Sequence, residues 1–314
     1  MPLYTNYIDI PKCNPLRWLK YNDNTKDDFF VNSISDFEQP ESYCQLFQQT
    51  DSIITQVRLL KSFVASYKME IVNEYLAVVQ TAASSVIYDD GKYIYIQFVV
   101  IPSTLSGYYF AKLSIDFANS LITRGDIYYS EPLNIRATHE NTILIGYRHK
   151  TNDFGVIFQR KLIGITPAQR IATTPQSTSL FYLRVHGGVW EADKGTASDD
   201  VMYINDSHDV TLLHSVPYNL QVIKFGDARG IPVWMYDKIV RAWACTYVQV
   251  DGQYYTKNEG ATVEKEAVER YPMVTGSLEI LPAENKYSDN YSAVVTKIPH
   301  GVGFDVIGIS FRIN

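Results

Sequence analysis

The chain has 314 residues, of which 46% are hydrophobic and 20% are charged. This length can supply more than one buried core, and the apolar content excludes an intrinsically disordered chain. The formal net charge is −6, and no cluster of Lys and Arg forms a basic patch along the sequence, so we expect no specific nucleic-acid binding. The 24 Tyr and 14 Phe residues suit half-buried pleated surfaces and predict an all-β fold.

The cysteines predict neither a metal site nor a disulfide framework. Cys13, Cys44 and Cys245 are far apart in the sequence and odd in number. The sequence does not open with a basic segment followed by an apolar core, and no apolar run reaches the length of a membrane span. We therefore expect no membrane insertion, no classical signal peptide, and folding in a reducing cytosol.

The first half of the chain predicts an arm followed by a β-sandwich. Residues 1–40 are expected to form an irregular N-terminal arm, because Asn14-Pro15 and residues 36–40 are rich in turn formers. Residues 41–165 contain short strand-like runs at the spacing of a sandwich domain. Asp89-Asp90-Gly91 predicts a hairpin, since Asp-Gly accepts positive φ. The expected strands are 52–60, 67–75, 93–101, 108–117, 127–136, 142–147 and 155–158.

The second half predicts a linker and a second β-domain. Residues 166–179 combine two prolines with small polar residues and lack apolar periodicity, which is typical of a linker. The second domain, 180–314, contains Asp251-Gly252, a strong signal for a two-residue hairpin. An exposed loop is expected at 192–209. The expected strands are 180–185, 211–215, 218–225, 277–281, 292–297 and 306–312.

One short amphipathic helix is predicted in this second domain. Gly226 and Gly230 bracket a turn that needs positive φ, and Pro232 suits the first helical turn. The apolar residues that recur at helical spacing, and should pack on the barrel, are Tyr236, Ile239, Val240 and Trp243. The charged residues on the opposite side, expected to face water or a partner chain, are Asp237, Lys238 and Arg241.

No sequence pattern carries a catalytic, cofactor or metal site. The segment 206–209, Asp-Ser-His-Asp, is polar enough for a cation, but a solvated loop explains it, and neighbours in a chain cannot form a catalytic triad. The two catalytic carboxylates of a glycosidase come together in space, so they leave little recognisable pattern in the sequence. The candidates for such a pair are Glu131, Glu140, Glu259 and Glu279. No phosphate-binding glycine loop is present. We therefore expect no catalytic residues, no cofactor, no metal and no enzymatic activity.

Several segments resemble virion tail proteins of phages that infect Bacteroidetes, including crAss-like phages. The resemblance lies in Leu213–Tyr218 with Gly226–Trp243, in Tyr43–Val57, and in Tyr129–Leu133 followed by Asn141–Tyr147. It covers parts of both halves and involves no catalytic motif.

The resemblance implies a structural role in the virion tail. It implies a tail-tube-like β-barrel with one helix for residues 180–314. It also implies a tail hub, ring or distal-tail-like component, which folds in the cytoplasm of the bacterial host. Six or twelve copies would close into a ring around the tail channel and contact other tail and portal-adjacent virion proteins.

The candidate interface residues come from the arm and from the helix region. Apolar side chains on an irregular arm need a surface to bury against, and a neighbouring subunit supplies one. The candidates are Trp18, Phe29, Phe30, Phe37, Asp227, Arg229, Asp237 and Arg241. An alternative function is a carbohydrate- or receptor-binding β-sandwich module, because sandwich domains with exposed aromatic residues can hold sugars.

Overall fold

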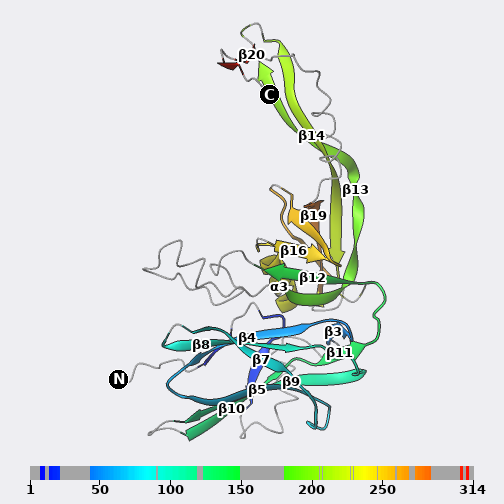
Figure 1. Cartoon of the computed structure of the whole chain (residues 1–314). Helices are drawn as coiled ribbons and strands as arrows, with labels where there is room; N and C mark the ends of the chain where they lie inside the picture. The colour runs from blue at the N-terminus through cyan, green and yellow to red at the C-terminus, as the bar shows by residue number, and fades with distance from the viewer. Residues whose placement is uncertain are drawn as a thin grey trace.

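Among the residues that the structure describes, the fold is mostly β, with one helix. The computed structural model describes residues 8–10, 14–21, 43–89, 91–118, 123–148, 180–204, 206, 208–226, 228, 230–245, 247–258, 260–268, 273–283, 305–306 and 309–310. Within them the chain forms a six-stranded antiparallel β-barrel plus additional sheets, which confirms the all-β prediction. In Figure 1 the additional sheets lie below the barrel, and a long hairpin extends above it.

The N-terminal half forms a β-sandwich of two layers. The first layer has the order β1 (Ile8–Asp9), β4 (Ile53–Leu60), β8 (Tyr93–Val100), β7 (Ala83–Asp89). The second has the order β6 (Val78–Thr81), β5 (Val64–Val72), β9 (Gly107–Ala118), β10 (Thr123–Ser130), β2 (Trp18–Tyr21). Side chains from both layers share one apolar core, which includes Ile96, Phe98, Leu113 and Ile115.

Within the first layer, strand β8 is buried on both faces. Successive side chains of a strand point to opposite faces. Ile94, Ile96 and Phe98 therefore point into the sandwich core, whereas Tyr93 and Tyr95 join a second core that the barrel and the helix share. This double burial explains why β8 is a nearly continuous apolar run rather than an alternating one.

Six strands close the barrel, and every neighbouring pair is antiparallel. Their order is β12 (Thr142–Arg148), β13 (Phe181–Ile204), β14 (Val210–Phe225), β19 (Met273–Pro282), β17 (Gln253–Lys257), β16 (Tyr247–Val250), and β16 pairs back to β12. The core includes Ile145, Leu183, Ile223 and Leu278, each at most 1% exposed. β12 precedes the predicted linker at 166–179, which lies outside the described residues. The barrel thus takes one strand from the segment 41–165, and the predicted domain boundary stays a prediction.

Short strands connect the sandwich to the barrel. β11 (Leu133–Arg136) pairs with β9 and, in parallel, with β3 (Gln45–Gln48), and β3 meets β13 where Leu46 faces Arg184. Two further strands, β15 (Ile231–Pro232) and β18 (Glu264–Ala267), pair with β19. β20 (Asp305–Val306) and β21 (Ile309–Ser310) pair with each other. Backbone pairing is therefore continuous from the sandwich into the barrel.

The predicted helix is α3 (Val233–Ala242), and the glycine-bracketed turn before it is confirmed. Gly226 and Gly230 have φ values of 84° and 75°, which residues with a Cβ rarely adopt. Pro232 does not lie in the first turn; it is the N-cap, with an extended ψ of 151°.

The buried face of α3 is confirmed except at one position. Tyr236, Ile239 and Trp243 are buried as predicted. Val240 is 37% exposed, so its assignment to the core is wrong. Met235 and Ala242 are also fully buried, so the buried side of the helix is centred closer to Ile239 than predicted. At 3.6 residues per turn, Val240 lies about 100° around the helix from the middle of that side and is therefore partly exposed.

The exposed loop expected at 192–209 is mostly strand. β13 continues to Ile204 and β14 starts at Val210, so this segment belongs to a long antiparallel hairpin (Figure 1). The strands expected at 211–215 and 218–225 are likewise one strand, with Pro217 opposite Ser198. A two-stranded ribbon can expose both faces to water, and it therefore tolerates the polar composition that suggested a loop.

Most strands of the first half are confirmed, with one interruption. The runs at 52–60, 93–101, 108–117 and 142–147 correspond to β4, β8, β9 and β12. The run at 127–136 divides into β10 and β11 around Glu131-Pro132, because proline cannot donate to a strand ladder.

Both predicted hairpins are confirmed. Gly91 has a φ of 84° between β7 and β8. Asp251 and Gly252 have positive φ between β16 and β17.

The described part of the N-terminal arm is not irregular. β1 pairs with β4 and β2 pairs with β10, both within the same chain. Leu16 is 1% exposed and belongs to the sandwich core. The strands predicted at 155–158 and 292–297 lie outside the described residues.

Candidate functional site

The end of the β13–β14 hairpin carries a group of exposed apolar side chains. Each of them is between 49% and 62% exposed, and they are Val201, Met202, Tyr203, Ile204, Val210, Leu212 and Leu213. Soluble monomers rarely expose a contiguous apolar patch unless it is an interaction site. The hairpin end is therefore the first candidate for contact with another chain.

The register of the hairpin places four of these side chains on one face. Met202 lies opposite Leu212, and Ile204 lies opposite Val210. Because alternate residues of a strand share a face, these four side chains form one stripe, which we call the apolar hairpin face. Asp206 and Asp209, both exposed, lie in the turn between the strands, so the stripe ends at two carboxylates.

The outer part of the hairpin also has open backbone edges. From Thr196 to Ile204, β13 pairs only with β14 among the described residues, and from Val210 to Asn219 β14 pairs only with β13. An open edge presents N–H and C=O groups on which another strand can pair.

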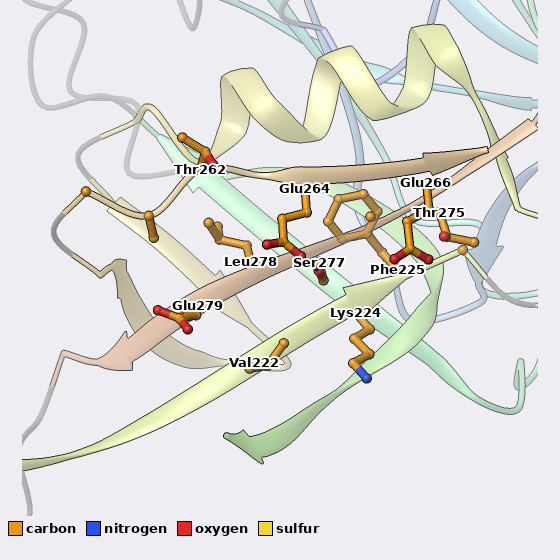
Figure 2. Close-up of a pocket in the computed structure, with 14 residues that line it drawn as sticks. Val222, Lys224, Phe225, Thr262, Glu264, Glu266, Thr275, Ser277, Leu278 and Glu279 are labelled. Atoms are coloured by element: carbon orange, nitrogen blue, oxygen red, sulfur yellow. Dashed lines mark hydrogen bonds between the residues drawn. The ribbon is translucent and has the colours of Figure 1, made fainter. Parts of the chain in front are cut away.

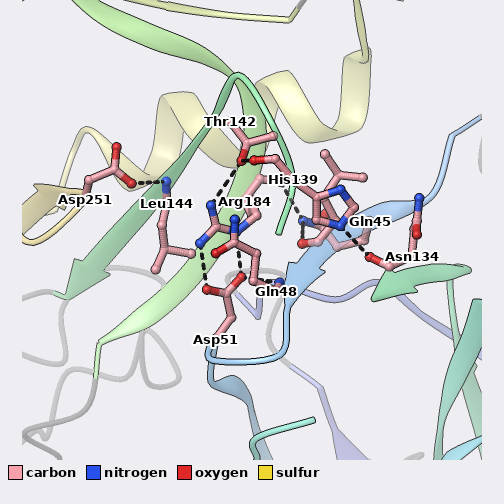
Figure 3. Close-up of polar contacts among 10 residues, drawn as sticks. Gln45, Gln48, Asp51, Asn134, His139, Thr142, Leu144, Arg184 and Asp251 are labelled. Atoms are coloured by element: carbon pink, nitrogen blue, oxygen red, sulfur yellow. Dashed lines mark hydrogen bonds and ion pairs between the residues drawn. The ribbon is translucent and has the colours of Figure 1, made fainter. Parts of the chain in front are cut away.

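A buried ion pair joins the barrel to the sandwich (Figure 3). Arg184 Nε donates to Asp51 Oδ2 at 2.6 Å and Arg184 Nη2 donates to Asp51 Oδ1 at 2.7 Å. The side chains of Arg184 and Asp51 are 7% and 2% exposed. Arg184 Nη1 also donates to Thr142 Oγ1 at 3.1 Å, and the Gln48 N–H donates to Asp51 Oδ2 at 2.7 Å. This bidentate ion pair fixes the orientation of β13 relative to the sandwich.

A buried carboxyl group lies at the same junction. Glu131 is 2% exposed, and its Oε2 accepts the backbone N–H of Arg17 at 2.7 Å. Burial raises the pKa of Glu131 to about 7, although the charge of Lys238 opposes the shift. Burial, and secondarily the charge of Glu131, raises the pKa of Tyr43 as well. The junction therefore contains a carboxyl group that titrates near neutral pH.

The structure brings three predicted interface residues to one cavity of about 420 Å³, which we call the helix cavity. Trp18 reaches it from β2, and Asp237 and Arg241 reach it from α3. The residues that line it are Ile10, Leu16, Arg17, Trp18, Leu19, Trp234, Asp237, Lys238 and Arg241. The Arg17 guanidinium lies 5.1 Å from the centre of the Trp234 ring, and Lys238 donates to the carbonyl oxygens of Asn14 and Leu16. The cavity thus combines apolar side chains with three cations and one carboxylate.

A second cavity, of about 610 Å³, borders β14, β18 and β19 (Figure 2). Its charged lining consists of Glu264, Glu266 and Glu279 with the single cation Lys224, and we call it the acidic groove. Ser277 Oγ donates to Glu264 at 3.1 Å. Asn258 Nδ2 donates to Glu279 at 3.2 Å. Within the described part of the chain, no three His, Cys, Asp or Glu side chains are grouped to hold a metal ion.

The remaining predicted site residues are distributed as follows. Phe29, Phe30, Phe37, Asp227 and Arg229 lie outside the described residues. Of the carboxylates considered for glycoside cleavage, Glu131 lies in the buried junction, whereas Glu279 lies in the acidic groove. Cys44 and Cys245 are free thiols.

Sequence reasoning missed the apolar hairpin face. A signal was present in the sequence, because the apolar segments 201–204 and 210–213 lie on either side of the polar turn at 206–209.

No family model, curated protein or solved structure matches the chain. In the part of the chain that the structure describes, no helix is long and apolar enough to cross a membrane.

Proposed function

We propose that the chain is a structural subunit of a phage tail, a hub, ring or adaptor component, which joins copies of itself into a closed ring around the tail channel. The observation that carries this proposal is the β13–β14 hairpin, which exposes an apolar face and two open edges beyond the barrel. A two-stranded ribbon is marginal in water by itself, and another chain can supply its missing contacts.

A ring would satisfy the open edges. If β13 of one copy lies beside β14 of the next, the antiparallel order continues from copy to copy, and a closed ring leaves no edge unpaired. The sequence resemblance to tail proteins supports the same function. Other tail and portal-adjacent virion proteins would then contact the ring.

The full-length chain tests this proposal through its mass in solution and its appearance in electron micrographs. We expect closed rings of six or twelve copies. The test variant replaces residues 201–214 with Asn-Gly, which suits a two-residue turn between Asp200 and Ser215. This variant should keep the melting temperature of the barrel and remain monomeric.

A matched pair of substitutions isolates the apolar contact. Edge pairing would place Val210 beside a strand of the next copy, so Val210→Ser should weaken ring formation by removing an apolar cross-strand pair, whereas Val78→Ser, at a similarly exposed position on β6, should not. A wild-type chain that stays monomeric at high concentration, or a shortened variant that still forms full rings, contradicts the proposal. A monomer that binds a sugar on a glycan array would instead favour the carbohydrate-binding alternative.

A further inference from the structure

Edge pairing in a ring leaves the apolar hairpin face uncovered. Strands that pair at an edge lie in the plane of the ribbon, whereas side chains stand roughly perpendicular to it. Met202, Ile204, Val210 and Leu212 would therefore remain exposed to water in a ring held together by its edges alone. This face needs a second surface.

The two cavities differ in how well they match the hairpin end. The hairpin end is apolar and terminates in the carboxylates of Asp206 and Asp209. The acidic groove presents three glutamates and would repel these carboxylates. The helix cavity presents apolar side chains, three cations and one carboxylate, and it therefore complements the hairpin end in both polarity and charge.

We infer that the hairpin end of one copy docks into the helix cavity of a second copy. The apolar hairpin face packs against Trp18, Leu19 and Trp234, and the turn carboxylates lie near Arg241 at the rim. The inference rests on the proposed function and adds to it a second contact between copies.

The position of the two surfaces determines the kind of assembly. Residues of α3 and of the N-terminal segment line the helix cavity. In Figure 1 the hairpin end lies on the far side of the barrel from α3. The nine residues Thr196–Ile204 alone extend roughly 30 Å at 3.3 Å per residue. The contact is head-to-tail and joins copies that are displaced along the hairpin. Rings would therefore stack on one another through it.

Directed disulfide formation tests the contact between two full-length variants. The native cysteines Cys13, Cys44 and Cys245 are first replaced with serine, and thermal melting checks that this background is folded. One variant then carries Asp206→Cys and the other carries Asp237→Cys, and the two are mixed under oxidising conditions. We expect this mixture to form a cross-linked dimer at least tenfold faster than a mixture of Asp206→Cys with Glu266→Cys, which probes the acidic groove.

A charge reversal then tests the electrostatic part. Arg241→Glu in the Asp237→Cys chain should slow cross-linking severalfold, whereas Lys224→Glu in the acidic groove should leave the rate unchanged. Equal rates at the two cavities, with rings still present by mass, would overturn the docking contact and leave the proposed function intact. A monomeric chain without cross-linking would overturn both.

Discussion

At the scale of single residues, the junction between the sandwich and the barrel contains two buried ionisable sites with opposite electrostatic requirements. Arg184 and Asp51 are nearly fully buried and satisfy each other through two hydrogen bonds. Glu131 has the opposite arrangement: it is buried, its pKa is raised to about 7, and its Oε1 has no hydrogen-bond partner among the described residues. The Arg184–Asp51 pair therefore requires both side chains to be charged, whereas the surroundings of Glu131 favour its neutral, protonated form.

Removal of one partner of the ion pair should be costly. Asp51→Asn leaves the Arg184 guanidinium buried without its counter-charge, and we expect a loss of roughly 3–5 kcal/mol in the free energy of unfolding. Chemical denaturation measures this loss. Lys61→Met, which breaks the exposed pair with Asp89, is the control and should leave the denaturation midpoint unchanged. Equal effects of the two substitutions would show that the buried pair does not hold the junction.

Glu131 should make the protein less stable as the pH rises through the weakly acidic range. Below its ordinary pKa of 4.5, both the folded and the unfolded chain hold the proton. Between about 4.5 and 7, the unfolded chain ionises while the folded chain keeps the proton, so stability falls with pH, by on the order of 3 kcal/mol in total. Denaturation curves from pH 4 to 8 should show this slope in the wild type and a flatter profile in Glu131→Gln. The same slope in both proteins would rule out Glu131 as its source.

At the scale of elements, α3 is stable because the barrel and the sandwich bury one side of it. Its N-cap forms no side-chain hydrogen bond, and its first turn contains no acidic residue. At the N-terminal end, side-chain capping and the helix dipole thus contribute little, and Arg241 is the basic residue of the last turn. Packing of the apolar face therefore supplies most of the stability.

Truncation on the buried side of α3 should be much more damaging than truncation on its exposed side. Trp243 is 5% exposed in the core that the barrel and the sandwich share, and Trp243→Ala should cost about 3–5 kcal/mol. Val240→Ala changes a partly exposed side chain of the same helix and should cost far less. Thermal melting of both variants measures the difference. An unchanged melting temperature for Trp243→Ala would remove this side chain from the core.

At the scale of the whole molecule, the two halves are joined by backbone pairing as well as by packing. β12 lies between β13 and β16 in the barrel, although it precedes the predicted linker. The face of the sandwich that carries Tyr93 and Tyr95 shares its core with the barrel and α3. The chain should therefore unfold as one cooperative unit.

Limited proteolysis tests this coupling. A cut anywhere between Arg148 and Leu180 should leave two fragments that stay together on a native gel and separate only in denaturant, because β12 keeps its hydrogen bonds to β13 and β16. Separation of the fragments under native conditions would contradict the coupling and favour independent domains.

The sequence by itself determined the local features of this protein. The alternating and continuous apolar runs predicted β4, β8, β9 and β12, and the positive φ values of Gly91, Gly226, Gly230 and Gly252 were predictable because few other residues adopt them. The short amphipathic helix was also predictable, because the helical spacing of its apolar residues can be read from a short segment of the sequence.

Only the tertiary structure decided which strands meet and which surfaces remain exposed. The structure joins residues that are about a hundred or more positions apart. Examples are the pairing of β12 with β16, the contact of Arg184 with Asp51, and the shared position of Trp18 and Arg241 at the helix cavity. The segment 192–209 resembled a loop in the sequence, because a two-stranded ribbon without a covering layer needs no apolar alternation along most of its length. Long-range contacts depend on the sum of many weak preferences, and no single segment of the sequence carries that sum.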